Sequence, residues 1–295
     1  GFEMLTVNWA SMRNQGVEVA LSTRNVHTKN FMWTTNFNFA YNNNKVLKEA
    51  LREDALEPGR EGYPAGALFA LKTAGLDEEG YPMFQDKDGK AVSAMEFFKL
   101  QEWGFGATDL TARERRELYT YVGTADCPYT GGFNNTFTYK AFELGVNFSF
   151  DFGGKVRCQP TYSIVDFDKG RNTNRDILNR WTPENTETIF PVLLSQNERL
   201  DEYMWYSNQN EIYRNLDIWI RDLNYVRLQN IRLGYTLPTN FSRTLGMTSA
   251  TVAIEGRNLL VFGSSYKNYL DPETMSNAYA TPAPKSVTLS LNLIF

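Results

Sequence analysis

The chain has 295 residues, of which 42% are hydrophobic, 14% aromatic and 22% charged, and its net charge is −4. This weakly acidic chain lacks the basic stripe that nucleic acid requires, so no nucleic-acid partner is expected. No apolar run approaches the roughly 18 residues of a membrane helix, and the mean hydropathy is −0.44. That average does not exclude a membrane barrel, because a membrane strand turns only every second residue toward lipid.

The chemistry-bearing residues argue against an enzyme. The chain has two cysteines and one histidine, too few for a four-ligand zinc site. A Ser–His–Asp or Cys–His mechanism would need His27, which we interpret as a solvated residue in the polar turn "NVHTKNF". In "DKDGK", Asp86 and Asp88 precede Gly89, but the calcium-loop pattern stops there, so we predict a polar turn. No phosphate loop or nucleophile elbow is present, and no cofactor or metal is expected.

Alternation of apolar and polar residues predicts seven strands. The period of the first strand slips near Arg24 and Asn25, which predicts a bulge. The next strand, "FMWTTNFNFAYNNNKV", carries aromatics along one side, as strands in a bilayer do. The apolar residues are odd-numbered up to Tyr139 and even-numbered from Phe142 on. A two-residue turn at Lys140 and Ala141 would explain this change, because it pairs Tyr139 with Phe142 on the same side of the sheet. The predicted strands are 15–26, 31–43, 132–139, 142–157, 224–237, 250–262 and 286–295.

The connections between these strands alternate between short and long. The short ones are 27–30, 140–141 and 238–249, and the long ones are 44–131, 158–223 and 263–285. Within 44–131, "GALFALKTAG" suggests a hairpin and "ARERRELYTYV" a short helix. Short turns facing the periplasm and long loops facing outside are typical of outer-membrane barrels, and they would place the C-terminus in the periplasm. The sequence thus predicts an all-β, transmembrane antiparallel β-barrel.

The last strand, "KSVTLSLNLIF", alternates regularly up to the terminal Phe295. Its apolar residues would face lipid, and closure against another strand would protect its edge. The apolar residues are Val287, Leu289, Leu291 and Leu293.

Several stretches, in chain order, resemble the C-terminal region of SusC/RagA-type TonB-dependent transporters of Bacteroidetes. They are "NQGVEVAL", "FMWTTNFNFAYNNNKV", "YPMFQDKDGKAV", "GGFNNTFTYKAFEL", "NRWTPENTET", "NYVRLQNIRLGYTLP", "VAIEGRNLLVF", "YLDPE" and "LNLIF". The resemblance implies that residues 1–295 are the C-terminal part, the last seven or so strands, of a larger plugged barrel. The plug and the TonB-contacting segment have no counterpart here, and the chain opens without a leader, so we expect a piece of a longer protein.

The resemblance also implies partners and a role for the terminus. The family works with a SusD-like surface lipoprotein and the TonB complex, and it imports a glycan or peptide across the outer membrane, whose lipid surrounds the barrel. Phe295 resembles the barrel-assembly signal of outer-membrane proteins. Two alternatives remain open: a passive porin, and a secreted carbohydrate-binding β-sandwich.

Two groups of residues are candidates for contact with substrate. Arg232, Glu255 and Arg257 would lie on the lumen wall, either in a salt-bridge network or in contact with ligand, because charge on the lipid face is costly. Aromatic residues in the predicted outer loops could stack on a ligand, contact the lid or form small loop cores. They are Trp103, Phe105, Trp181, Trp205 and Tyr206.

The two cysteines would lie at the outer ends of neighbouring strands. If Tyr139 pairs with Phe142, Cys127 opposes Gly154 and lies about 13 Å along the ladder from Cys158, at about 3.4 Å per residue. A disulfide needs Cα atoms within about 7 Å. Irregular backbone after Cys127 and an oxidising compartment would nevertheless favour a bridge. We therefore hypothesise a Cys127–Cys158 disulfide, with two unpaired thiols as the alternative.

Overall fold

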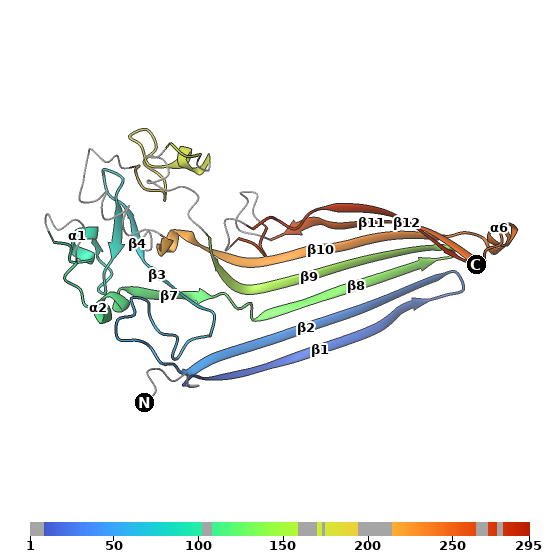
Figure 1. Cartoon of the computed structure of the whole chain (residues 1–295), viewed down its shortest axis with the longest axis horizontal. Helices are drawn as coiled ribbons and strands as arrows, with labels where there is room; N and C mark the ends of the chain where they lie inside the picture. The colour runs from blue at the N-terminus through green and yellow to red at the C-terminus, as the bar shows by residue number, and fades with distance from the viewer. Residues whose placement is uncertain are drawn as a thin grey trace, which may run out of the picture.

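The computed structural model describes residues 9–101, 108–158, 170–172, 175–193, 214–263, 271–275 and 280–295. Seven long strands form one antiparallel sheet in chain order, β1-β2-β8-β9-β10-β11-β12 (Figure 1). Their bounds are β1 Ser11–His27, β2 Phe31–Lys48, β8 Tyr129–Tyr139, β9 Phe142–Arg157, β10 Ile220–Thr236, β11 Ser249–Phe262 and β12 Ser286–Ile294. The predicted strands and the antiparallel, all-β fold are confirmed.

Several strands are longer than the alternation indicates, and every extension of more than one residue is at the end that carries the long connections. β2, for example, runs on to Lys48, and its ladder with β1 includes Asn42, Asn43 and Asn44. Because these three consecutive residues are all polar, this part of β2 shows no apolar–polar alternation. The backbone hydrogen bonds of the ladder still form, since they do not depend on side-chain polarity. The sequence pattern therefore locates the strands but misses their polar extensions.

The register follows the predicted pairing. Tyr139 pairs with Phe142, and the same register continues to the pair Tyr129–Phe152. Lys140 at the hairpin tip has φ 53°, the positive φ that two-residue hairpin turns need. The β1–β2 register shifts between Arg24 and Val26, which confirms the predicted bulge. The three short connections lie at one end of the sheet together with the C-terminus (Figure 1).

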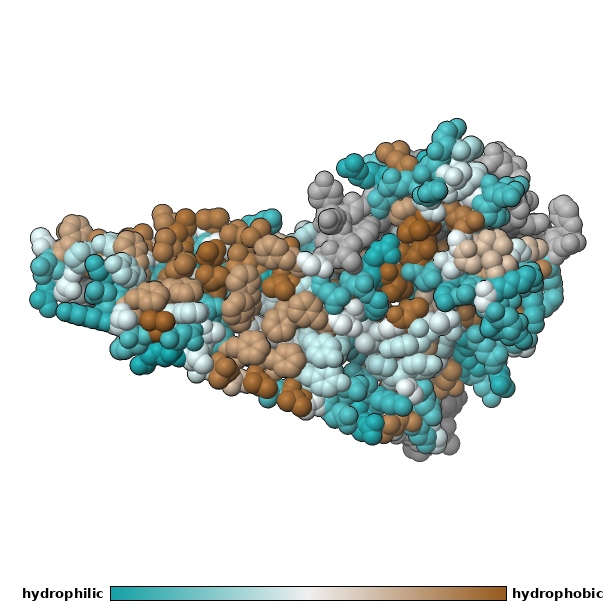
Figure 2. All heavy atoms as spheres, turned by 180° about the vertical axis from the view of Figure 1, so that it is seen from behind, coloured by the Kyte–Doolittle hydropathy of each residue, from teal (hydrophilic) through white to brown (hydrophobic). Residues whose placement is uncertain are grey.

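One face of the sheet is apolar from edge to edge. Paired residues on antiparallel strands face the same side, so register alone assembles rows across the sheet. One such row is Leu21, Phe37, Phe133, Phe148, Leu228 and Leu260. Leu289 and Leu291 on β12 are 76% and 63% exposed. Figure 2 shows this face as a broad hydrophobic zone over the sheet, and no second layer of the described residues covers those two leucines.

Aromatic rows border the apolar face at both ends. Phe31, Tyr139, Phe142 and Tyr235 form the row beside the short turns. Tyr41, Tyr129 and Phe152 form the row toward the long connections. From Tyr129 to Tyr139 the strand covers about 34 Å at about 3.4 Å per residue, or roughly 26 Å along the barrel axis at a strand tilt of about 40°.

One polar cluster interrupts the apolar face between these rows. Asn135 is only 8% exposed, and its Oδ1 accepts hydrogen bonds from Trp33 Nε1 at 2.9 Å and Thr35 Oγ1 at 2.7 Å. Asn25, the residue displaced by the β1 bulge, donates through Nδ2 to Thr35 Oγ1 at 2.6 Å. These polar groups satisfy one another, which lowers the cost of placing them on an apolar surface.

The described parts of the two longer excursions, 44–131 and 158–223, fold together beyond one end of the sheet (Figure 1). Their elements are β3 Ala67–Leu71, β4 Thr73–Leu76, β5 Pro82–Gln85, β6 Ala91–Val92, α1 Ala94–Phe97, α2 Ala112–Glu117, β7 Tyr119–Thr124, η1 Arg175–Asn179 and η2 Asp217–Trp219. The helix predicted within 44–131 is α2, which the capping box of Thr111 and Glu114 begins. None of the described helices is both long and apolar enough to traverse a bilayer.

The hairpin expected at "GALFALKTAG" is wrong. β3 pairs with β7, far along the chain, and β4 pairs with β5. The reason is the second excursion. Leu71 N donates to Asn215 O at 2.8 Å, and Thr73 Oγ1 donates to Asp217 Oδ1 at 2.6 Å. These bonds tie the chain between β3 and β4 to the segment that enters η2, so the two strands do not turn onto each other.

A separate hydrophobic core holds the excursions together. Leu71 and Phe84 come from the first excursion, Leu216 and Trp219 from the second, and all four are at most 2% exposed. Phe84 stacks on Phe97 at 4.8 Å between ring centroids. Burial of such side chains contributes about 1.5–3 kcal/mol each. The described parts of these two connections therefore pack into one unit with its own core.

Candidate functional site

The polar face of the sheet carries two ion pairs between its middle and the end with the short turns. Arg232 Nη1 lies 3.2 Å from Glu143 Oε1, and Arg257 Nε lies 2.5 Å from Glu255 Oε1. Glu255 pairs in register with Arg232 and Thr288, so the predicted wall residues share the face opposite Leu289. They form two separate pairs, with Glu143 as an added partner, rather than one network.

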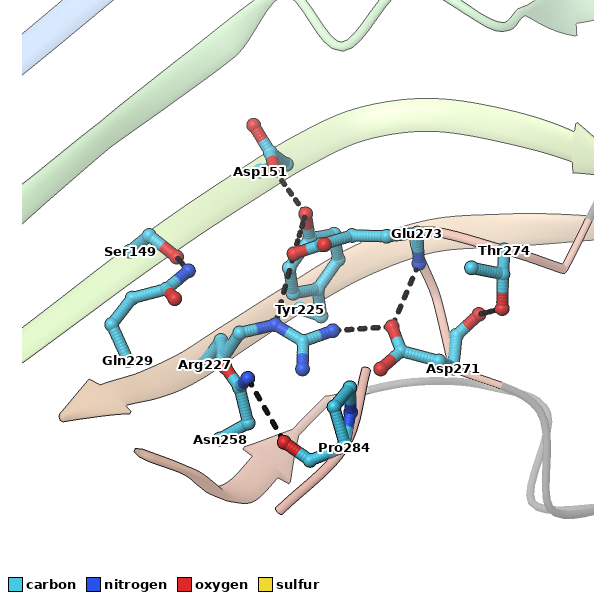
Figure 3. A network of polar contacts seen from close by, with 10 residues as sticks. All are labelled: Ser149, Asp151, Tyr225, Arg227, Gln229, Asn258, Asp271, Glu273, Thr274 and Pro284. Carbon is cyan, nitrogen blue, oxygen red and sulfur yellow. Dashed lines mark hydrogen bonds and ion pairs between the residues drawn. The ribbon is translucent and has the colours of Figure 1, made fainter. Parts of the chain in front are cut away.

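A denser charged cluster lies further along the same face, around Arg227 on β10 (Figure 3). Arg227 is 2% exposed and forms ion pairs with Asp271 and, at 2.9 Å through Nε, with Glu273. Tyr225 donates to Asp151 and lies 3.3 Å from Glu273. One buried cation thus meets two carboxylates from a distant segment, as a buried arginine requires.

The segment 271–275 is fixed to the wall by this cluster. Glu273 N donates to Asp271 Oδ1 at 3.0 Å, so the same carboxylate that binds Arg227 also closes the local turn. Met275 is 2% exposed and packs with Val156 and Cys158. Asn258 on β11 donates to Pro284 O at 3.2 Å (Figure 3). Ionic and apolar contacts together therefore hold part of the connection 263–285 against β9 and β10.

Sequence reasoning missed the Arg227 cluster because of a bulge. Arg227 and Arg232 differ in parity, so a regular strand would place them on opposite faces. The β10 ladders with both neighbours shift between Leu228 and Asn230, which brings both arginines to the polar face. The one feature of the sequence that could have indicated partners for Arg227 is "YLDPE", which contains the acidic residues Asp271 and Glu273.

Comparison with known proteins now bears on this wall. No family model matches the chain. TonB-dependent receptor P3 of Formosa agariphila is 26% identical over 98% of the chain, and TonB-dependent receptor SusC of Bacteroides thetaiotaomicron is 23% identical over 98%. The structure of the RagAB peptide transporter superposes on 97% of the chain with a TM-score of 0.69 and 22% identity. In sequence and in fold, the chain is similar to SusC/RagA-like TonB-dependent receptors.

The chain covers only part of these relatives. It spans 29% of P3, 27% of SusC and 30% of the RagAB chain. An open seven-stranded sheet with one apolar and one polar face is what a segment of a larger barrel presents. The sheet therefore has the form of a segment of a larger barrel, similar to that of the RagAB transporter. The described parts of 44–131 and 158–223, which we call the external unit, lie beyond one end of it (Figure 1).

One of the five loop aromatics lies within the described residues, and its ring packs against backbone. Trp181 is half-buried and stands so close to Gly80 that a Cβ there would lie 2.5 Å from the ring. Gly80 also has φ 85°, which favours glycine. Contact of Trp181 with a ligand stays a prediction. Trp103, Phe105, Trp205 and Tyr206 lie outside the described residues.

The hypothesised disulfide is wrong in this structure, where Cys127 and Cys158 are both free thiols. The register explains this. Cys127 Sγ sits over Gly154, 2.5 Å from where a Cβ would be, and points toward Leu223 O at 3.9 Å. Cys158 instead packs beside Met275. Burial raises the pKa of both thiols above the ordinary value.

The remaining candidates have simple surroundings. Asp86 Oδ1 accepts from the backbone N–H of Asp88 and Lys90 at 3.0 and 2.7 Å, so "DKDGK" forms the predicted polar turn. No metal-binding group of three or more ligands occurs among the described residues. His27 is exposed at the end of β1. Phe295 follows β12 and is 82% exposed; its role in assembly stays a prediction.

Proposed function

We propose that this chain forms part of the wall of an outer-membrane transporter that imports a glycan or peptide nutrient by TonB-dependent energy coupling. The observation that supports it best is the apolar face, whose rows of apolar side chains cross the sheet from edge to edge. The aromatic rows on that face are separated by roughly 26 Å along the barrel axis, near the apolar band of about 25 Å in outer-membrane barrels. In this arrangement the apolar face meets lipid and the polar face lines the lumen.

The orientation follows from the connections. Short turns face the periplasm in such barrels and long loops face outside, so the C-terminus is periplasmic and the external unit is at the cell surface. We propose that this unit contacts a SusD-like lipoprotein, by analogy with SusC and with RagAB. The TonB complex would act on a part of the transporter that this chain does not include. The function is transport rather than chemistry.

The two alternatives, a carbohydrate-binding sandwich and a passive porin, differ from this proposal in what covers the apolar face and in whether transport needs energy. A carbohydrate-binding sandwich needs a second layer over its apolar face, and the high exposure of Leu289 and Leu291 argues against one. A passive porin would share the strands and differ only in energy coupling. The sequence similarity to TonB-dependent receptors favours coupling over passive flow.

Uptake by the full-length protein in its native outer membrane tests the proposal. We expect uptake of a labelled oligomeric nutrient to fall at least tenfold when the proton gradient is collapsed with a protonophore or when TonB is deleted. A strain that lacks only this transporter sets the background. Uptake that depends on the transporter but persists without TonB would identify a passive porin instead.

A further inference from the structure

Two basic residues lie directly opposite each other on β1 and β2, at the end of the sheet that adjoins the long connections (Figure 1). Arg13 pairs in register with Lys45, and both are exposed. We call these two residues the basic pair. The ladder runs without a shift from the basic pair to the pair Val17–Tyr41, four residues further along each strand. Because side chains alternate along a strand, residues four apart face the same side, so the basic pair lies on the apolar face.

The basic pair lies beyond the aromatic row that contains Tyr41. On the same face, Gln15 and Asn43 pair between that row and the basic pair. Lys45 is about 14 Å beyond Tyr41 along the strand, or roughly 10 Å along the barrel axis at a strand tilt of about 40°. The polar headgroup layer adds about 5–8 Å on each side of the hydrocarbon core of a bilayer, and lysine and arginine side chains can reach back toward it. The charges of the basic pair are therefore at the level of the outer headgroups.

No carboxylate of the described residues neutralises the basic pair. Neither of its side chains forms an ion pair with any residue that the structure describes. Glu18 is on the polar face, and Asp126 accepts a hydrogen bond at 3.0 Å from Asn44, which is also on that face. Glu49 accepts from the backbone N–H of Arg60. Like charges directly opposite each other destabilise an antiparallel pair, and an anion bound between the two side chains would remove that repulsion.

We propose that the basic pair binds a phosphate group of lipopolysaccharide, the phosphorylated glycolipid of the outer leaflet. An arginine forms two parallel hydrogen bonds with a phosphate, and a lysine adds a point charge. A membrane lipid holds its phosphates at the headgroup level, where the basic pair lies, and basic side chains at that level attract anionic lipids. This inference rests on the proposed function, which orients the sheet in the membrane, and it adds a lipid site on the outside of the barrel.

The test measures lipid binding by the full-length transporter, purified with its partners in a non-ionic detergent. Two lipid probes are compared by native mass spectrometry: lipid A with its phosphates, and the same lipid after enzymatic removal of the phosphates. Inorganic phosphate is added as a competitor, because a free anion has the same chemistry as the phosphate of a lipid. The comparison of the two lipids on the wild-type protein requires no substitution, so it does not depend on the folding of a variant.

Three double variants separate the basic pair from the net charge of the protein. Arg13→Gln/Lys45→Gln removes both charges, and Arg13→Lys/Lys45→Arg exchanges the two residues while it keeps the charge. Lys29→Gln/Lys140→Gln is the matched control, because it removes the same charge from the connections 27–30 and 140–141 at the opposite end of the sheet. Heat-modifiable barrel must remain at the wild-type level in all three.

We expect Arg13→Gln/Lys45→Gln to bind lipid A at least tenfold more weakly than wild type, since each basic residue at an anionic surface contributes roughly fivefold. The exchanged variant should stay within about threefold of wild type and the control within about twofold. Wild-type protein should bind the dephosphorylated lipid as weakly as the glutamine variant binds lipid A. Equal binding of lipid A by wild type and the glutamine variant overturns the proposal, and so does wild-type binding that does not depend on the phosphates.

Further results separate this inference from its alternatives. If millimolar inorganic phosphate displaces lipid A from the wild-type protein, the basic pair takes a free anion and its assignment to a lipid fails. If uptake persists without TonB but lipid A binding still depends on the basic pair, the energy-coupled function fails while the lipid site stands. If uptake depends on TonB but the glutamine variant binds lipid A like wild type, the lipid site alone fails.

Discussion

At the scale of single residues, the wall is organised around a few buried charges. Arg227 is the clearest case, since it is 2% exposed and lies against two carboxylates. Removing one partner from a buried ion pair leaves the other charge uncompensated, which costs about 3–5 kcal/mol. An exposed pair such as Arg257–Glu255, in which the arginine side chain is 61% exposed, contributes about 0–1 kcal/mol.

The first prediction follows from this contrast. Arg227→Met in the full-length protein should release the segment 271–275, because Asp271 and Glu273 lose their cation. A local cost of about 3 kcal/mol corresponds to a rise of roughly 150-fold in hydrogen exchange of the backbone amides in that segment. Arg257→Met is the matched control and should change exchange less than about fivefold. Exchange that is equally slow in both variants would show that Met275 alone holds the segment.

The second prediction concerns the thiols. Burial raises the pKa of Cys127 and Cys158, so the thiolate fraction at a given pH is smaller than for free cysteine, and thiol alkylation in the folded protein should be slower. Because the thiolate is the nucleophile, the rate should rise with pH until the raised pKa is passed. After denaturation without reductant, both residues should label with maleimide. Labelling that requires prior reduction would establish a disulfide after all.

At the scale of elements, the sequence predicts strands that show a regular apolar–polar alternation. It does not predict pairings and core contacts between segments that are far apart in the chain. The alternation in β8 and β9 predicts their register, because a two-residue turn at Lys140 and Ala141 must pair Tyr139 with Phe142. Every later pair of the hairpin then follows from that first pair. The β10 bulge has no such signature, so Arg227 was not placed with Arg232. The β3–β7 pairing and the core of Leu71 and Trp219 join segments far apart in the chain, and no local pattern encodes such contacts.

The third prediction tests depth along the apolar face of β12. Val287 shares a row with Val146, between the two aromatic rows, whereas Leu291 shares a row with Tyr235 at the border. Arginine on the lipid face costs about 2–4 kcal/mol near the midplane and about 0–1 kcal/mol at the interface. Val287→Arg should therefore lower the amount of folded, heat-modifiable barrel far more than Leu291→Arg.

Thr288→Arg is the control for that series, because Thr288 pairs with Glu255 on the polar face. It should assemble at close to the wild-type level. Equal assembly of all three arginine variants, or a worse defect for Thr288→Arg than for Val287→Arg, would contradict the assignment of the apolar face to lipid.

At the scale of the whole molecule, the chain has two parts with different surfaces. No layer of described residues covers Leu289 and Leu291 on the apolar face of the sheet, whereas an antiparallel sheet in a water-soluble protein packs that face on a core. The external unit buries its own core of Leu71, Phe84, Leu216 and Trp219 in the usual way. This division means that assembly of the sheet and function of the external unit can be perturbed separately.

The fourth prediction uses that separation. Deleting Phe295 should lower the amount of transporter in the outer membrane, because the terminal aromatic resembles an assembly signal. The molecules that do assemble should import at the wild-type rate per molecule, since Phe295 lies at the end remote from the external unit. Phe295→Tyr keeps an aromatic ring and should retain most of the abundance. Unchanged abundance after the deletion would remove the assembly role.

The two edges of the seven-stranded sheet have a consequence for the chain on its own. Among the described residues, β1 is hydrogen-bonded only to β2, and β12 only to β11, so each outer edge presents a ladder of backbone groups that no other described strand pairs with. Long open edges beside an apolar surface are templates for pairing between molecules. Produced alone in aqueous buffer, residues 1–295 should stack edge to edge into β-rich fibrillar aggregates with a repeat of about 4.8 Å.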